Sequence, residues 1–432
     1  MIVPAARLLW LVAAMGLPLA VMAAVSPGSR QAVLLAAGCA AAVAAADAWI
    51  ARNGLRGIRA RLVEPVRFLK DRPARLRLEI AGIGAGPARL GIAWPEGLSA
   101  GSDVLTVTAP ESPFVVEWPF TPERRGKHTI GAVHVERLSR WGFWEVRGPA
   151  GGGIEIHAMP SLGTAGDVLS FRRLTVGQRA VRQVGKGREF EKLREYLPGD
   201  GFDEIHWKAS ARRARPVTKV FQVERTREVF VVLDGSRLTG RMAGSDTRLE
   251  RYTSAALVMA AAAARHGDKF GLVTFQDRVV DFVPAGQGAI HMAACRRALA
   301  RIAVKSTPAD FQEIATELRL RLRGRALVLF LTDLDDPAAS EAFAPAAKFL
   351  SARHLVAAAT IRPDGAKALF SDAPETVDEV YEQLSGHMAW RALKELEISL
   401  RRQGVRFGMF ERETLGAQVA GLYADIKSRQ LL

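Results

Sequence analysis

The chain has 432 residues, of which 49% are hydrophobic, and it contains 60 Lys and Arg residues against 45 Asp and Glu residues. This length allows two or three domains, and the share of apolar residues excludes a globally disordered chain. The formal net charge of +15 indicates an anionic neighbour, which could be a membrane surface, a nucleic acid or an acidic protein. The only cysteines are Cys39 and Cys295, which excludes a disulfide framework and a Cys-rich zinc site.

Two apolar runs lie near the N-terminus. Residues 8–25 carry no charged side chain, and residues 31–50 carry only Asp47. Each run is long enough to cross the hydrocarbon core of a bilayer as a helix, and the short turn SPGSR separates them. The pattern predicts a transmembrane helical hairpin over residues 1–54. A cleaved signal peptide is the alternative for the first run, but the second run favours the hairpin.

The positive charges that flank these runs predict their orientation. The turn carries one arginine, Arg30, whereas the segment after the second run carries Arg52, Arg56, Arg59 and Arg61. The positive-inside rule therefore places both termini in the cytoplasm, with the hairpin in a bacterial inner membrane. Part of the basic excess would then face anionic membrane lipid.

The body of the chain divides by pattern into three parts. Residues 55–160 contain short alternating stretches such as RLRLEI, with Leu76, Leu78 and Ile80 on one face, and predict a small β-sandwich-like domain. Residues 161–224 form a linking segment. From residue 225 apolar strands alternate with helical patterns, which predicts an α/β domain with a doubly wound, mostly parallel sheet over residues 225–432. Pro308 suits the first turn of one of its helices.

Two acidic residues end two apolar strands of the α/β region: Asp234 in VVLDGSRL and Asp333 in LFLTDLDD. Ligands of open α/β sheets bind beyond the carboxyl ends of the strands. Asp234 and Ser236 resemble the start of the metal-ion-dependent adhesion site of von Willebrand factor A domains, and Thr307 and Asp333 match its distant Thr and Asp. This resemblance implies Mg²⁺ as a cofactor. Leu238 replaces the second Ser of the motif, so the site is degenerate, and the alternative is that both aspartates cap nearby loops and helices.

Motifs of common enzymes are absent from the sequence. It contains no phosphate-binding Gly-x4-Gly-Lys loop, no Gly-x-Ser-x-Gly elbow and no His-Glu-x-x-His pair. We therefore assign no catalytic residue and predict that the protein is not an enzyme. The alternative is a Mg²⁺- or Mn²⁺-dependent phosphoesterase that uses Asp234 and Asp333 as metal ligands, although the sequence offers no convincing general base.

The segment REYLPGDGFDEIHWKASARRAR, residues 194–215, interleaves acidic, basic and aromatic residues around a Pro-Gly turn. It resembles the signature of the bacterial domain-of-unknown-function 58 family. The matching positions are Glu189, Phe190, Leu193, Arg194, Tyr196, Gly199, Asp200, Ile205, Trp207, Lys208, Ser210 and Arg212.

The resemblance implies an N-terminal membrane hairpin, a β-rich segment and a von Willebrand factor A-like domain. It also implies an accessory protein that works with a MoxR-type AAA+ ATPase in assembly, stress resistance or cell-envelope processes, with other cell-envelope proteins as further partners. The family brings no established catalytic residues.

Three interpretations of the signature segment remain open. The first is a clasp between the β domain and the α/β domain, in which Arg194, Asp200 and Arg212 form ion pairs while Tyr196 and Trp207 pack. The second is a docking surface for the ATPase. The third is a phosphate or nucleic-acid site, which the four carboxylates of residues 194–215 disfavour. The residues assigned to the clasp or docking surface are Arg194, Tyr196, Gly199, Asp200, Trp207, Lys208 and Arg212.

Overall fold

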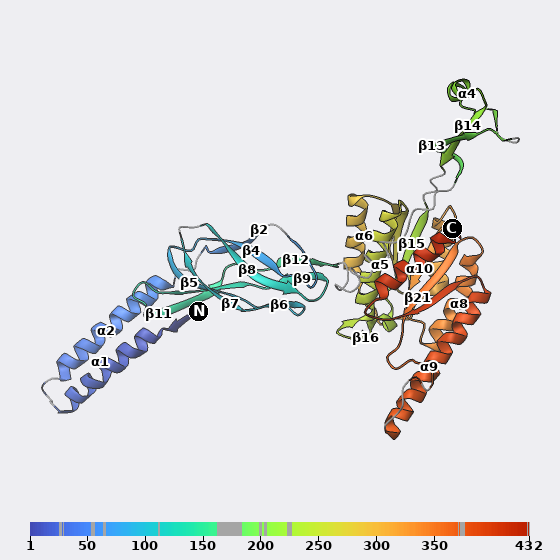
Figure 1. Ribbon diagram of the computed structural model, residues 1–432. Helices are drawn as coiled ribbons and strands as arrows, with labels where there is room; N and C mark the ends of the chain where they lie inside the picture. Colours follow the sequence, from blue (N-terminus) through green and yellow to red (C-terminus); the bar gives the residue numbers. More distant parts are fainter. Residues whose placement is uncertain are drawn as a thin grey trace. The chain divides into compact units, whose positions relative to one another are not determined.

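Figure 1 shows a computed structural model of the chain, which describes residues 1–25, 28, 30–52, 57–63, 66–110, 113–161, 184–197, 201–202, 205–222, 227–369, 371, 376–429 and 431. The chain forms two compact units, Met1–Ser161 and Leu162–Leu432. The predicted α/β fold class is confirmed: two N-terminal apolar helices precede a β-rich domain and then an α/β domain with a doubly wound sheet.

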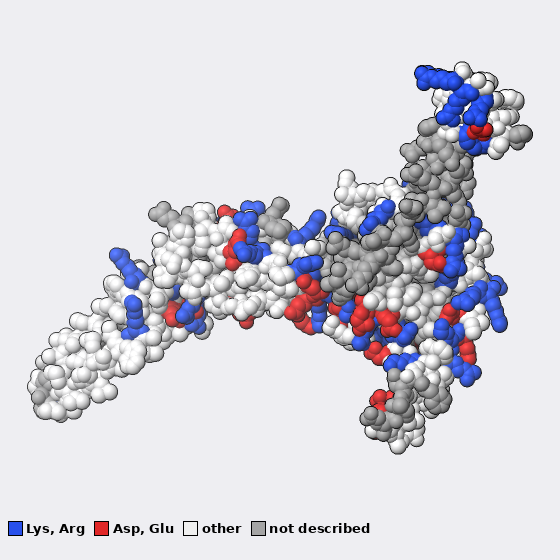
Figure 2. All heavy atoms as spheres, in the orientation of Figure 1, with Lys and Arg blue, Asp and Glu red and all other residues white. Residues whose placement is uncertain are grey.

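The two apolar runs form helices α1 (Ala6–Val25) and α2 (Arg30–Ala51). Their most apolar windows have mean hydropathies of 2.3 and 1.9, and only 6% of each window is buried. Both helices are therefore long and apolar enough to cross a membrane. The face of this pair that Figure 2 shows is mostly uncharged. Helices of this kind make the protein membrane-associated.

Short strands continue the chain on both sides of the two helices. Strand β1 (Ile2–Pro4) precedes α1 and pairs antiparallel with β11 (Trp144–Pro149), so the first residues belong to the β domain. The Met1 ammonium group also donates a hydrogen bond to the Arg147 carbonyl oxygen at 2.7 Å. A strand of three residues is too short to show a periodicity, and the sequence did not predict it.

The charged residue of the second run, Asp47, is fully buried at the base of α2. Its carboxylate accepts hydrogen bonds from Ser139 Oγ at 2.5 Å and from the Trp141 backbone N–H at 3.3 Å. The indole Nε1 of Trp144 donates to the Ala44 carbonyl oxygen at 2.8 Å. Because a buried carboxylate requires hydrogen-bonding partners, these contacts fix the end of α2 on the turn between β10 (Val133–Leu138) and β11.

Among its described residues, the β domain contains three small sheets. Its further strands are β2 (Arg59–Val63), β3 (Arg67–Leu69), β4 (Ala74–Ala81), β5 (Gly86–Ile92), β6 (Leu98–Ala100), β7 (Val104–Ala109), β8 (Phe114–Pro122), β9 (Gly126–Ile130), β10 (Val133–Leu138) and β12 (Ile154–Met159). The sheet orders are β1-β11-β10-β5-β7, β2-β4-β8-β6 and β3-β12-β9. The predicted alternation of β4 is confirmed, because Leu76, Leu78 and Ile80 all point into the core.

The α/β domain is built on one sheet of order β19-β18-β15-β20-β21-β22. Its strands are β15 (Glu228–Asp234), β18 (Lys269–Phe275), β19 (Val279–Gly286), β20 (Leu327–Leu331), β21 (Leu355–Ile361) and β22 (Arg406–Phe410). All neighbours run parallel except β19, which pairs antiparallel with β18. The chain adds strands to one side of β15, with β18 and β19, and then to the other side, with β20, β21 and β22, as in doubly wound sheets. The carboxyl ends of β15 and β20 therefore lie at a switch point.

Helices cover both faces of this sheet (Figure 1). They are α5 (Arg248–Arg265), α6 (Ala289–Arg301), α7 (Phe311–Arg321), α8 (Pro337–Ser351), α9 (Val377–Arg402) and α10 (Leu415–Ser428). Val229, Val231 and Leu233 pack with α5, α6 and α10, whereas Phe230 and Val232 pack with α7, α8 and the end of α9. A strand buried on both faces must be apolar at every position, which explains the unbroken apolar run of β15.

One local prediction was wrong. Pro308 does not lie in the first turn of a helix, because α7 begins at Phe311. Asp310 is the N-cap, and its side chain accepts a hydrogen bond from the Glu313 backbone N–H at 2.9 Å. The cap satisfies a backbone donor that has no intrahelical partner, and this contact sets the start of the helix.

Candidate functional site

The first candidate site is the carboxyl edge of the α/β sheet, where β15 ends at Asp234. Both oxygens of this buried carboxyl group accept hydrogen bonds: Oδ1 from the Ser236 backbone N–H at 2.7 Å and Oδ2 from Thr332 Oγ1 at 2.6 Å. Burial raises the pKa of Asp234 above its ordinary value, although these hydrogen bonds lower it in part. The Asp234 side chain therefore orders the loop that follows β15, in agreement with the capping alternative.

The other predicted metal ligands lie at the same edge. The Arg237 backbone N–H donates to the Thr307 carbonyl oxygen at 3.0 Å, which holds Thr307 beside the loop of Ser236. Asp333 follows Thr332, whose hydroxyl contacts Asp234. Leu238 lies in a short 3₁₀ helix (Arg237–Gly240) and is largely buried. The structure thus brings Asp234, Ser236, Thr307 and Asp333 to one edge, as the motif predicts.

Sequence reasoning missed an arginine at this edge. Arg248 is the first residue of α5 and is only 7% exposed. Its Nη1 donates to Asp333 Oδ1 and also to Asp335 Oδ2, the latter at 3.0 Å. Arg241 Nη1 binds the other oxygen of Asp335 at 2.9 Å. A signal was available, because a cation at the N-terminus of a helix is unfavourable unless an anion compensates it.

Desolvation dominates the electrostatics of this cluster. Burial raises the pKa of Asp333 to about 7, and the positive charge of Arg248 opposes that rise. Asp335, nearer the surface, raises the pKa of Asp333 further through its own negative charge. Two carboxyl groups so close together inside a protein can both be ionised only with a cation beside them, and Arg248 contacts both here.

The residues do not form a complete ligand set for a resident Mg²⁺ ion. Leu238 supplies no oxygen, both Asp234 oxygens accept hydrogen bonds, and Asp333 Oδ1 is paired with a guanidinium group. Ser236 Oγ, Thr307 Oγ1 and Asp333 Oδ2 are buried without a hydrogen bond among the described residues, so three oxygens of the predicted ligand set could still turn to a cation. The edge is suited to a positive charge, and Arg248 already supplies one; the predicted Mg²⁺ ion stays a prediction.

The second candidate site is the signature segment, which folds as a hairpin. Strands β13 (Val184–Glu195) and β14 (Val217–Gln222) pair antiparallel, and helix α4 (Trp207–Arg213) lies between them in sequence. His206 caps α4, since its Nδ1 accepts a hydrogen bond from the Ala209 N–H at 3.1 Å. Ser210 Oγ accepts from the Val217 N–H at 2.9 Å and donates to the His206 carbonyl oxygen at 3.1 Å. The small hydroxyl residue of the signature therefore ties the helix to the strand.

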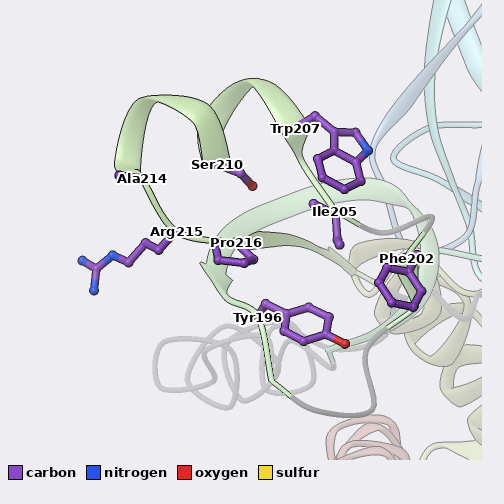
Figure 3. Close-up of a pocket in the computed structure, with 8 residues that line it drawn as sticks. All are labelled: Tyr196, Phe202, Ile205, Trp207, Ser210, Ala214, Arg215 and Pro216. Atoms are coloured by element: carbon purple, nitrogen blue, oxygen red, sulfur yellow. The ribbon is translucent and has the colours of Figure 1, made fainter.

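An apolar cavity of about 550 Å³ opens in this hairpin. Figure 3 shows the rings of Tyr196, Phe202 and Trp207 around Ile205, with Arg215 pointing away. Tyr196 and Phe202 stack with ring centroids 6.5 Å apart. Phe202 and Trp207 remain 75% and 68% exposed, whereas Ile205 is buried. Aromatic side chains that line an open cavity and stay largely exposed are characteristic of protein-binding surfaces.

The charged residues of the signature segment lie at the end of β13 and on α4. Arg194 Nη1 donates to the Glu195 carbonyl oxygen at 3.1 Å, and Glu195 pairs with Arg215 at 2.5 Å. Lys208 and Arg212 lie on α4 and are exposed. Gly199 and Asp200 fall outside the described residues. The contribution of the segment to an interdomain clasp stays a prediction.

Comparisons with known proteins agree with the sequence resemblance. Residues 192–378 match the family model described as "Protein of unknown function DUF58", a region that begins near the end of β13 and includes α4, β14 and most of the α/β sheet. A 42-residue stretch is 43% identical to the uncharacterized protein YeaD of Bacillus subtilis (strain 168), and it covers 10% of this chain and 11% of that protein. The chain thus aligns with only about a tenth of the length of this relative.

Several solved structures resemble the chain at low scores. An aerotolerance-related membrane protein from Bacteroides fragilis has a TM-score of 0.31 and 16% identity, over 46% of this chain and 98% of its own. BatB from Bacteroides thetaiotaomicron has a TM-score of 0.31 and 12% identity, over 47% and 99%. The VWA domain of SpRpn10 has a TM-score of 0.29 and 10% identity, over 46% and 95%. The fold described above rests on its own strand order and not on these likenesses.

Proposed function

We propose that this chain, which carries a region of the DUF58 family over residues 192–378, is a membrane-anchored adaptor without enzymatic turnover that works with a MoxR-type AAA+ ATPase. The adaptor would act in assembly, stress resistance or cell-envelope processes. The membrane-associated helix pair, the doubly wound sheet and the family region support this proposal together. Docking of the partner on the signature hairpin is the specific step that we propose.

The observation that carries the proposal is the exposed aromatic cavity of the hairpin. Phe202 and Trp207 keep most of their surface exposed beside the apolar cavity within their own unit (Figure 3). Large aromatic residues in a pocket contribute most of the binding energy of many interfaces.

The charges near the cavity indicate which charge the partner surface would carry. Helix α4 carries Lys208, Arg212 and Arg213 and no acidic residue. Figure 2 shows basic side chains over this end of the hairpin. A partner surface with acidic residues around an apolar anchor would complement the helix, and the electrostatic attraction would speed association.

The proposed location follows from the flanking arginines. We propose the bacterial inner membrane, with both termini in the cytoplasm, because Arg52, Arg56, Arg59 and Arg61 outnumber Arg30 of the turn. In that orientation the signature hairpin and the α/β sheet lie in the cytoplasm, the compartment that supplies AAA+ ATPases with ATP. A reporter fused to the C-terminus that fluoresces only in the cytoplasm should be active, and a silent reporter would contradict the orientation.

The test is a cross-linked pull-down of the full chain from detergent-solubilised membranes that contain a MoxR-type ATPase, with and without nucleotide. The double variant Phe202→Ala, Trp207→Ala should recover at least about tenfold less ATPase than the parent, since each anchor of this kind contributes 1–2 kcal/mol or more. Leu320→Ala is the matched control, because Leu320 is 74% exposed on helix α7.

Two outcomes would contradict the proposal. The first is recovery of no AAA+ ATPase by the parent chain in either nucleotide state, which would remove the partner. The second is equal recovery by the parent and the double variant, which would move the docking site away from the hairpin.

A further inference from the structure

The carboxyl edge of the α/β sheet buries more acidic than basic groups. Asp234 and Asp333 end or follow two adjacent strands and are almost completely buried, and the side chain of Asp335 is only 9% exposed. Charges removed from water at this density must be compensated by a cation, a proton or a network of donors. Asp234 is satisfied by a network of donors, because Ser236 and Thr332 both bind it. Asp333 and Asp335 both contact the same guanidinium group, that of Arg248.

We infer that the guanidinium group of Arg248 is the resident cation of this edge and stands in place of a divalent metal ion. Arg248 bridges Asp333 and Asp335 through the same Nη1 atom. Its side chain is 9% exposed, about as deeply buried as that of Asp335. Guanidinium is always charged and is more weakly hydrated than an ammonium group, so it is the basic group best suited to such a buried position.

The position of Arg248 in the chain supports a dedicated role. It is the first residue of α5, directly after the N-cap Thr247, whose side chain accepts a hydrogen bond from the Glu250 N–H. A positive charge there opposes the helix dipole, so its own helix does not favour it. The compensating interaction comes from Asp333 and Asp335, which lie in the loop after the neighbouring β20.

The degenerate motif fits the same inference. At position 238 a leucine stands where the metal site of the resembled domain has a hydroxyl ligand, and the loss of an oxygen weakens binding of a hard cation. A fixed guanidinium makes the order of the edge independent of the divalent ion concentration. This inference concerns the sheet edge and holds whether or not the signature hairpin docks an ATPase.

The experiment measures hydrogen–deuterium exchange of the purified full chain in peptides that cover residues 228–240 and 327–337. The parent should show the same protection with EDTA and with millimolar Mg²⁺. In Arg248→Ala these peptides should exchange at least about tenfold faster without metal, because the buried carboxylates lose their cation. Millimolar Mg²⁺ should slow that exchange again, since the carboxylates then accept the ion in place of the guanidinium.

Two further variants keep the test decisive. Arg248→Lys preserves the charge, so both peptides should stay protected in EDTA. This variant keeps the test possible if Arg248→Ala does not fold. Arg241→Ala is the matched control, because Arg241 is 46% exposed and binds only the outer carboxylate, Asp335, among the pairs described. It should change the exchange of both peptides by less than about twofold.

Three results would overturn the inference. Loss of protection in the parent on addition of EDTA would show that a metal ion is the resident cation. Unchanged exchange in a folded Arg248→Ala would show that the edge needs no cation from this residue. Exchange in folded Arg248→Ala that Mg²⁺ does not slow would show that the two cations are not interchangeable at these carboxylates.

Discussion

The carboxyl edge of the sheet and the signature hairpin differ in which groups they bury and which they expose. At the sheet edge, charged groups are buried and each described carboxyl group meets a donor, as Asp234 does with Thr332 and Asp333 with Arg248. In the hairpin, apolar groups are exposed, since Trp207 and Phe202 keep most of their surface open. Buried charged groups that meet donors inside the protein indicate a stabilising role, whereas exposed apolar surface indicates a binding partner. The contrast supports the two proposals made above, a stabilising role for the metal-like motif and partner recognition by the family signature.

The largest effect should come from breaking the buried pair. Asp333→Ala leaves the Arg248 guanidinium buried beside Asp335 alone, and the loss of a partner in a buried pair costs about 3–5 kcal/mol. Chemical denaturation of the full chain, followed through the α/β domain, should show this loss of unfolding free energy. A loss below about 1 kcal/mol would show that the edge is not held by this pair.

Removal of both charges, those of Asp333 and Arg248, tests the same buried pair in a second way. The double variant Asp333→Leu, Arg248→Met replaces the charges by apolar side chains and should be more stable than Asp333→Ala alone, because no unpaired charge remains buried. A double-mutant cycle with the two single variants gives the coupling energy, which should exceed about 1 kcal/mol for residues in direct contact. Additive effects would contradict a functional pair.

A smaller effect is expected at the base of the helix pair. Asp47→Ala removes the acceptor for Ser139 Oγ and the Trp141 N–H, and such buried hydrogen bonds to a charged group contribute about 1.5–3 kcal/mol each. Limited proteolysis of the chain in detergent should cut the turn around residues 139–143 faster in the variant. Asp47→Asn keeps an acceptor and should lie between the two. Equal cutting rates for all three would mean that Asp47 does not fix this turn.

The smallest effects belong to the hairpin surface. Arg215→Ala removes the ion pair with Glu195, but both side chains are more than half exposed, so stability should change by less than about 0.5 kcal/mol. The double variant Phe202→Ala, Trp207→Ala should likewise leave thermal unfolding nearly unchanged while partner recovery falls. A large loss of stability in either variant would return the hairpin to a clasp.

Much of the fold follows from the sequence for physical reasons. Alternation in RLRLEI predicts one buried face, and an unbroken apolar run such as that of β15 predicts a strand covered on both sides. The convergence of Asp234, Ser236, Thr307 and Asp333 at one edge also followed from strand ends and motif spacing. These features depend on local pattern and on the geometry of parallel sheets.

The features that sequence reasoning missed depend on contacts between distant residues. Ile2–Pro4 becomes a strand only because β11 offers an edge, and Arg248 meets Asp333 across 85 positions of the chain. The cavity of the hairpin forms because α4 folds back through Ser210 onto Val217. Two signals were nevertheless visible: Asp47 as the lone charge of an apolar run, and Arg248 as a base at the start of a helix.

The most direct test of the account is site-specific photo-cross-linking from the hairpin in intact membranes. A photoreactive amino acid replaces Trp207 in one chain and Leu320 in the control. If the hairpin docks its partner, position 207 should cross-link to the AAA+ ATPase and position 320 should not. Cross-links from position 207 only to the β domain of the same chain would contradict the account and establish the clasp instead.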